Sequence, residues 1–117
     1  MARMTREQIE KVQDIRTEDF LIPEWKGSIG LRELSGEQRM QVEREQPKFV
    51  EKNDSLGFAC LLVSLCVVDD EGNALFTLEQ AQALRKKNAG VLVRIMDKIN
   101  EINKLTRGVM EETRKNS

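Results

Sequence analysis

A thirteen-residue apolar run, Leu56–Val68, constrains the fold more than any other segment, because only Gly57 and Ser64 interrupt it. A membrane-spanning helix needs about 20 apolar residues, and this run ends in Asp69 and Asp70. The run therefore predicts a central helix that is apolar on nearly every face. Such a helix must be covered by its neighbours, or by another subunit where they leave a side open.

The two cysteines, Cys60 and Cys66, both lie in this run. Six residues apart on one helix, they point to different faces and cannot form a disulfide with each other. Two buried free thiols are typical of a protein in a reducing cytoplasm. The charged N-terminus shows no apolar segment of a signal peptide, which agrees with that location.

The first third of the chain predicts an arm followed by a β-hairpin. Thr5 and Gln8 have the spacing of a capping box, which predicts a helix from about Arg6 to Gln13 within a weakly held or mobile arm, residues 1–17. The apolar runs 20–25 and 29–34 flank a turn at Lys26-Gly27-Ser28 and predict the hairpin. Its first strand is expected to be an edge strand or to end near Pro23, which cannot donate to a ladder.

Three further helices are expected around the central one. A second capping box at Ser35 opens a polar helix, from Gly36 to about Gln46, that Pro47 is expected to end. It is either a solvated helix or part of a partner interface. The segment 48–53 is a connector, and Asp54 or Ser55 caps the central helix.

After the central helix, the acidic stretch 69–73 is expected to be a plain turn, since its spacing does not match a calcium-binding loop. A third capping box at Thr77 opens a helix to about Lys87, whose basic last turn suits a helix C-terminus. Asn88 breaks the chain before the last helix. The cleanest helical period in the sequence follows, and it comprises Leu92, Ile95, Met96, Ile99, Ile102 and Leu105.

These elements predict a single domain over residues 1–117, of α+β class and predominantly α-helical. A short N-terminal β-hairpin precedes a bundle of about four helices around one apolar central helix, and residues 106–117 form a frayed tail.

Composition argues against catalysis. The 117 residues contain no His and no Tyr, which removes His-dependent nucleophilic catalysis and common zinc sites. Nineteen basic and twenty acidic residues leave a net charge of -1, so no basic field favours nucleic acid or a membrane surface. We expect no enzyme activity, no cofactor and no metal site, but a binding or assembly protein.

Trp25, with Pro23 and Glu24 before it, is the most conspicuous candidate for a functional site. A lone Trp at a hairpin can anchor the hairpin on the core. Alternatively it is an exposed contact residue, because Trp is enriched at protein interfaces. The sequence leaves both interpretations open.

Three segments in order resemble one protein family. Residues 22–27, IPEWKG, with 31–39, LRELSGEQR, resemble the opening of tail assembly chaperones of long-tailed phages with non-contractile tails. Residues 67–77, VVDDEGNALFT, and the helix 84–105 resemble later segments of that family. Lys26 and the pair Asn103-Lys104 depart from the family pattern at turns.

The resemblance implies a function in the host cell cytoplasm, encoded by a phage or prophage. Members of the family bind the tape measure protein, keep it soluble and help recruit the tail tube protein, in some cases through a longer frameshifted form. They assemble into homo-oligomeric rings or spirals and are absent from the finished virion. The alternative is a structural phage component, such as a head–tail connector or a tail completion subunit.

Overall fold

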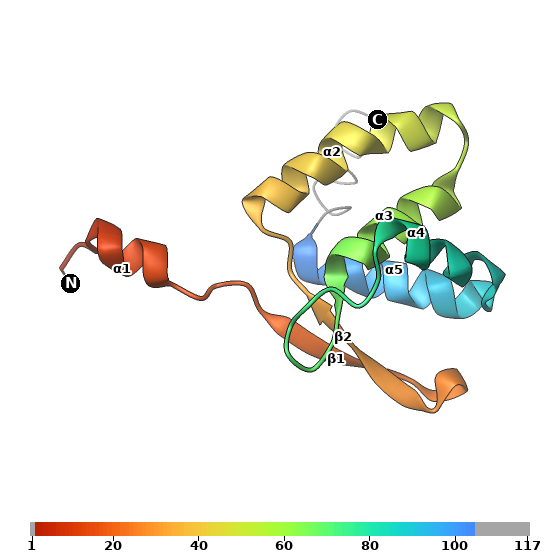
Figure 1. Ribbon diagram of the computed structural model, residues 1–117, viewed down its shortest axis with the longest axis horizontal. Coiled ribbons are helices and arrows are strands. Elements are labelled where there is room, and N and C mark those ends of the chain that lie inside the picture. Colours follow the sequence, from red (N-terminus) through yellow and green to blue (C-terminus); the bar gives the residue numbers. More distant parts are fainter. Residues whose placement is uncertain (1, 105–117) are drawn as a thin grey trace, which may run out of the picture.

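The computed structural model describes residues 2–104, which form five α-helices, two 3-10 turns and a three-stranded antiparallel sheet (Figure 1). The predicted α+β, predominantly helical class is confirmed. The elements are α1 (Arg6–Lys11), β1 (Thr17–Ile22), η1 (Pro23–Trp25), β2 (Gly27–Arg32), α2 (Gly36–Glu51), α3 (Ser55–Cys66), β3 (Val67–Val68), α4 (Leu78–Ala81), η2 (Gln82–Lys86) and α5 (Ala89–Asn103). The predicted frayed tail, 106–117, lies outside the described residues, as does Leu105.

Local capping chemistry sets the helix starts. The three predicted capping boxes, at Thr5, Ser35 and Thr77, all form, each with a Gln three residues later. The side chain of Asp54 caps α3, and that of Asn88 caps α5. These five polar side chains therefore fix where the helices begin, as their sequence positions indicated.

The hairpin forms in the predicted place, but its turn differs. β1 and β2 pair from Thr17↔Arg32 to Ile22↔Gly27, and β1 is an edge strand that ends just before Pro23. The turn is a 3-10 turn over Pro23–Trp25, and Lys26 has a φ of 57°. The prediction of a turn at Lys26-Gly27-Ser28 was wrong because Pro23 starts the turn three residues earlier and leaves Gly27 to begin β2.

The central helix is shorter than its apolar run. α3 ends at Cys66, and Val67 and Val68 form the third strand, antiparallel to β2. The prediction of a helix through Val68 was wrong there, because β2 offers hydrogen-bonding groups to two β-branched residues that suit a strand. The apolar run thus forms two elements; both residues of β3 are buried, and so are six residues of α3.

Pro47 does not end α2, as the sequence suggested, but lies inside it. A proline there lacks the N–H that would donate to the carbonyl of Glu43. Because Glu43 is exposed, water can bond to this carbonyl instead. Beyond the proline, the ring of Phe49 packs on Phe58 of α3 with ring centroids 6.0 Å apart. This contact holds the last turn of α2 on the body.

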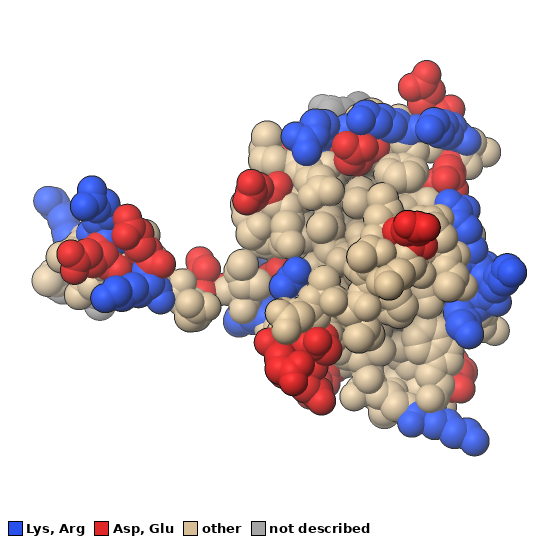
Figure 2. Space-filling view, viewed as in Figure 1, with Lys and Arg blue, Asp and Glu red and all other residues tan. Residues whose placement is uncertain are grey.

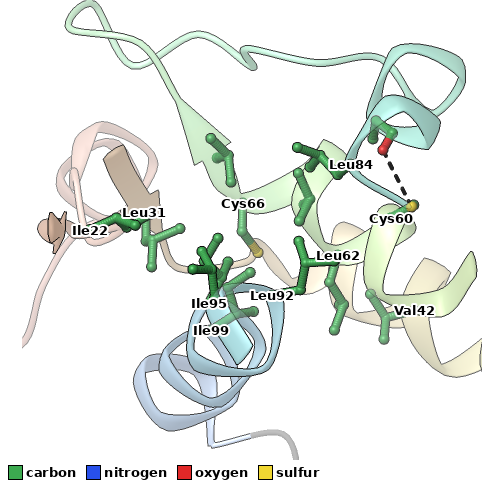
Figure 3. Packing of buried hydrophobic residues seen from close by; sticks show 14 residues of the cluster. Ile22, Leu31, Val42, Cys60, Leu62, Cys66, Leu84, Leu92, Ile95 and Ile99 are labelled. Atoms are coloured by element: carbon green, nitrogen blue, oxygen red, sulfur yellow. Dashed lines mark hydrogen bonds between the residues drawn. The ribbon is translucent and has the colours of Figure 1, made fainter. Parts of the chain in front are cut away.

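One cluster of buried side chains joins the sheet to the helices (Figure 3). Ile22 and Leu31 of the hairpin meet Cys66 of α3 and Ile95 and Ile99 of α5. Toward the N-terminal end of α3, the cluster continues through the residues Val42, Cys60, Leu62, Leu84 and Leu92. The predicted stripe of α5 is confirmed for its described members, which are buried or partly buried.

Candidate interaction surface

The hairpin tip brings the sequence-predicted residues to the end of the sheet, beside α5. Pro23 begins η1 there, and the Glu24 carboxylate forms an ion pair with the guanidinium of Arg94 on α5. The hydrogen bond from Arg94 lowers the pKa of Glu24 and raises that of Arg94. Glu24 is therefore engaged by its own chain, and it orients the tip on α5.

Trp25 lies beside this ion pair with 37% of its surface exposed. It is absent from the buried cluster and from the partly buried side chains packed on it. The tip thus offers an exposed indole whose neighbour, Glu24, is held in place. An indole on a positioned turn can contact a partner at little entropic cost.

Two polar side chains attach the hairpin to the helices. The Arg32 guanidinium donates to the carbonyl of Leu65 (3.1 Å) and to that of Gly72 (3.1 Å). The Oδ1 of Asn103 accepts from the backbone N–H of Leu34 (2.7 Å), directly after the hairpin. Sequence reasoning missed both residues, because their partners lie more than 30 positions away.

The acidic stretch 69–73 forms a turn, as predicted. One carboxylate oxygen of Asp69 accepts the backbone N–H groups of Glu71 and Asn73, both at 2.9 Å, and Gly72 has a φ of 85°. This carboxylate is used to build the turn. Among residues 2–104, no three His, Cys, Asp or Glu side chains gather where they could hold a metal ion.

Burial separates the two thiols from solvent. It raises the pKa of the Cys66 thiol to about 12, and it also raises that of Cys60. The Cys60 Sγ donates to the carbonyl of Ala81 at 3.4 Å (Figure 3). Both cysteines are free, and their environment favours packing over nucleophilic chemistry.

Two large apolar side chains are exposed around the start of α4. Figure 2 shows a face there that is mostly uncharged but carries an acidic side chain near α4, and it is bordered by basic side chains along α2 and by the acidic turn. Leu75 and Leu78 are the exposed large apolar residues of this part of the chain. Their neighbour Phe76 packs on the core and fixes their position.

A groove of about 260 Å³ lies between the end of α2 and the start of α3. Phe49, Val50 and Phe58 line it, and Val50 is 71% exposed. The sequence did not predict this groove, because the helix was expected to end at Pro47, which placed Phe49 and Val50 in a connector. The spacing of Val42 and Phe49, seven residues or two turns apart, was the available signal that the helix continues.

At the base of the groove, Asp54 accepts from Gly57 N at 2.9 Å and from two nitrogens of Arg85 at 3.1 and 3.3 Å. The hydrogen bonds from Arg85 hold the pKa of Asp54 below its usual range. A Cβ at position 57 would lie 2.2 Å from the Asp54 Oδ2, so any larger residue there would displace the capping carboxylate. One carboxylate thus caps α3 and fastens η2 to it.

The whole arrangement, a hairpin packed on a small helical bundle with exposed apolar faces, has a counterpart among solved structures. The chain is similar to the tail assembly chaperone of bacteriophage HK97, with a TM-score of 0.57 and 21% sequence identity, over 81% of this chain and 89% of that one. At that identity the similarity shows a shared fold. No family model and no curated protein matches the sequence.

None of the helices in the described part of the chain has the length and apolar character needed to cross a bilayer.

Proposed function

We propose that this chain is a phage tail assembly chaperone, and the observation that carries the proposal is the fold it shares with the HK97 tail assembly chaperone. The similarity extends over most of both chains. The ordered sequence motifs at the hairpin, the acidic turn and the last helix point to the same family independently of the fold.

The proposed client is the tape measure protein. A long helical chain presents apolar stripes that aggregate when they are unpaired. The exposed Leu75 and Leu78, on a mostly uncharged face, offer a complementary surface. Such a contact has modest strength at one site and gains avidity when many copies bind along one client.

In this proposal the chain acts without catalysis or cofactor, in the cytoplasm of the host cell, as a homo-oligomeric ring or spiral. It helps recruit the tail tube protein and leaves before the tail is complete. Trp25 at the hairpin tip is the proposed contact residue for a partner. Replacing it by Ala is expected to weaken assembly or client binding with only a small loss of melting temperature, because the indole lies outside the buried cluster.

The alternative, a structural component such as a connector or completion subunit, makes a different prediction about the particle. Quantitative mass spectrometry of infected or induced cells and of the purified particles separates the two. A chaperone is abundant in the cells and absent from the particles. A fixed number of copies per particle would contradict the chaperone proposal.

A further inference from the structure

The N-terminal arm, residues 2–15, stands away from the body with every residue exposed (Figure 1). It is nevertheless built as a helix, since Thr5 and Gln8 cap each other reciprocally at the start of α1. An isolated helix of six residues is unstable in water, because nucleation costs more than so few hydrogen bonds return. The arm therefore has the local chemistry of a helix but lacks the packing that would stabilise one.

The arm carries apolar side chains suited to such packing. Ile9 lies in α1, and Val12 is the residue that ends this helix, three positions later; they are 59% and 45% exposed. Glu7, Glu10 and Lys11 share the helix with Ile9 and give the arm the mixed charge that Figure 2 shows. An exposed apolar pair on a charged helix is the pattern by which amphipathic helices dock in grooves.

The arm is anchored at its base. The backbone N–H of Arg16 donates to the Glu33 carboxylate at 2.7 Å, and the carbonyl of Arg16 accepts from Glu33 N at 2.9 Å. The hydrogen bonds that the Glu33 carboxylate accepts from Arg16 lower its pKa, and together with the backbone bond they fix the point from which the arm leaves. The two grooves beside this point are lined mainly by charged and polar side chains, so they offer little to Ile9 and Val12.

The groove lined by Phe49, Val50 and Phe58 is open, and its surface is mainly apolar, although Gln46, Asn53, Asp54 and Ser55 also border it. It lies at the end of α2 opposite to the point where the arm of the same chain leaves the body. Four extended residues from Arg16 to Val12, and one helical turn more to Ile9, reach about 18 Å. Val50 is fourteen residues, or about 21 Å, along α2 from Gly36, which shares a groove with Arg16. Figure 1 shows the arm leaving on the side opposite to the end of α2.

We propose that Ile9 and Val12 of the arm dock in the Phe49–Val50–Phe58 groove of a second copy of this chain. Arm and groove are different surfaces, so each copy uses its arm on one neighbour and its groove on the other. Such a heterologous contact repeats from copy to copy and generates a ring or an open spiral. The inference builds on the homo-oligomer of the proposed function and names the contact that holds it together.

The test compares the solution mass of the full-length chain with that of two variants, by light scattering after size exclusion or by native mass spectrometry. The double variant Ile9→Asp with Val12→Asp disables the arm, and Val50→Asp disables the groove. Both are expected to be folded monomers of 13.5 kDa, whereas the wild-type chain is a larger oligomer. Matched controls are Gln13→Asp on the arm and Val93→Asp, a 57% exposed valine on α5, which should retain the wild-type mass.

Mixing the two monomeric variants tests the contact between arm and groove most directly. The groove variant still has its arm and the arm variant still has its groove, so one pair forms and growth stops at twice the monomer mass. The inference would be overturned if the wild type were monomeric or if either variant kept the wild-type mass. It would also be overturned if a control variant lost mass or if the two variants formed no pair on mixing. The ability of the wild type to solubilise the client is a separate measurement, so failure of this contact is distinguishable from failure of the proposed function.

Discussion

The two prolines of the chain should respond to the same substitution with opposite signs. Pro47 lies inside α2, where it removes one helical hydrogen bond, whereas Pro23 is at the start of η1, where no N–H is needed. Replacing Pro47 by Ala restores the N–H that can bond the carbonyl of Glu43. Replacing Pro23 by Ala restores an N–H with no such role.

The magnitude for Pro47 follows from two opposing effects. Ala is more favourable than Pro by about 3 kcal/mol in a helix interior. The greater freedom of the unfolded chain without proline offsets about 0.4–1 kcal/mol of this gain. The expected result is a free energy of unfolding higher by about 2 kcal/mol and a melting temperature higher by about 10 °C. For Pro23→Ala only the unfolded-state effect remains, a loss of about 0.5 kcal/mol.

Urea unfolding followed by circular dichroism measures both variants, with an unchanged slope confirming that the transition is the same. If α2 ended before Pro47, as the sequence alone suggested, Pro47→Ala would leave the protein equally or slightly less stable. That result would refute a continuous helix to Glu51 and with it the position of the Phe49–Val50–Phe58 groove.

Three further outcomes are expected. Leu62→Ala removes a 1% exposed side chain from the core and should lower the free energy of unfolding by about 3 kcal/mol. Leu21→Ala, at a 66% exposed position, should change this free energy by less than about 0.5 kcal/mol. Equal losses for the two variants in urea unfolding would contradict the assigned core. In the native protein at pH 8.5, Cys66 should remain unmodified by iodoacetamide, because burial raises the pKa of its thiol to about 12. Rapid alkylation of Cys66, detected by mass spectrometry, would show that the thiol is accessible. Asp54→Asn should be less stable than wild type at pH 7, because it loses the ion pair with Arg85. Since the pKa of Asp54 is lowered in the folded state, the difference in stability should shrink as the pH falls below ~3.9. A difference that is independent of pH would argue against the ion pair.

Most of the fold could be predicted because its signals are local. Each capping box is a contact between residues three apart, and the period of α5 reflects one buried face of one helix. The hairpin was also visible, although its turn was placed three residues late. Such features depend on a few neighbouring side chains and are readable wherever they occur.

The errors arose where a distant partner decides the conformation. Val67 and Val68 leave the helical state because β2 lies alongside, and Phe49 extends α2 past Pro47 because it packs on Phe58. Neither partner is close in sequence, and local propensity was overridden in both cases.

The candidate site was predictable only in part, for the same reason. Trp25 and Glu24 were singled out as unusual residues, but the ion pair to Arg94, 70 positions away, shows itself only in three dimensions. The groove at Val50 depends on the uninterrupted α2. The sequence predicted a weakly held or mobile arm, but its pattern does not indicate which surface Ile9 and Val12 contact.

The central claim is that this chain keeps a long helical client soluble, and co-expression tests it most directly. The client is the product of the longest open reading frame next to the gene, expressed with the wild-type chain, with Leu78→Asp on the exposed face, or alone. The account predicts a soluble client that co-purifies with the wild-type chain, and an insoluble client with Leu78→Asp or without a partner. A client that stays insoluble beside the folded wild-type chain, with nothing co-purifying, would contradict it.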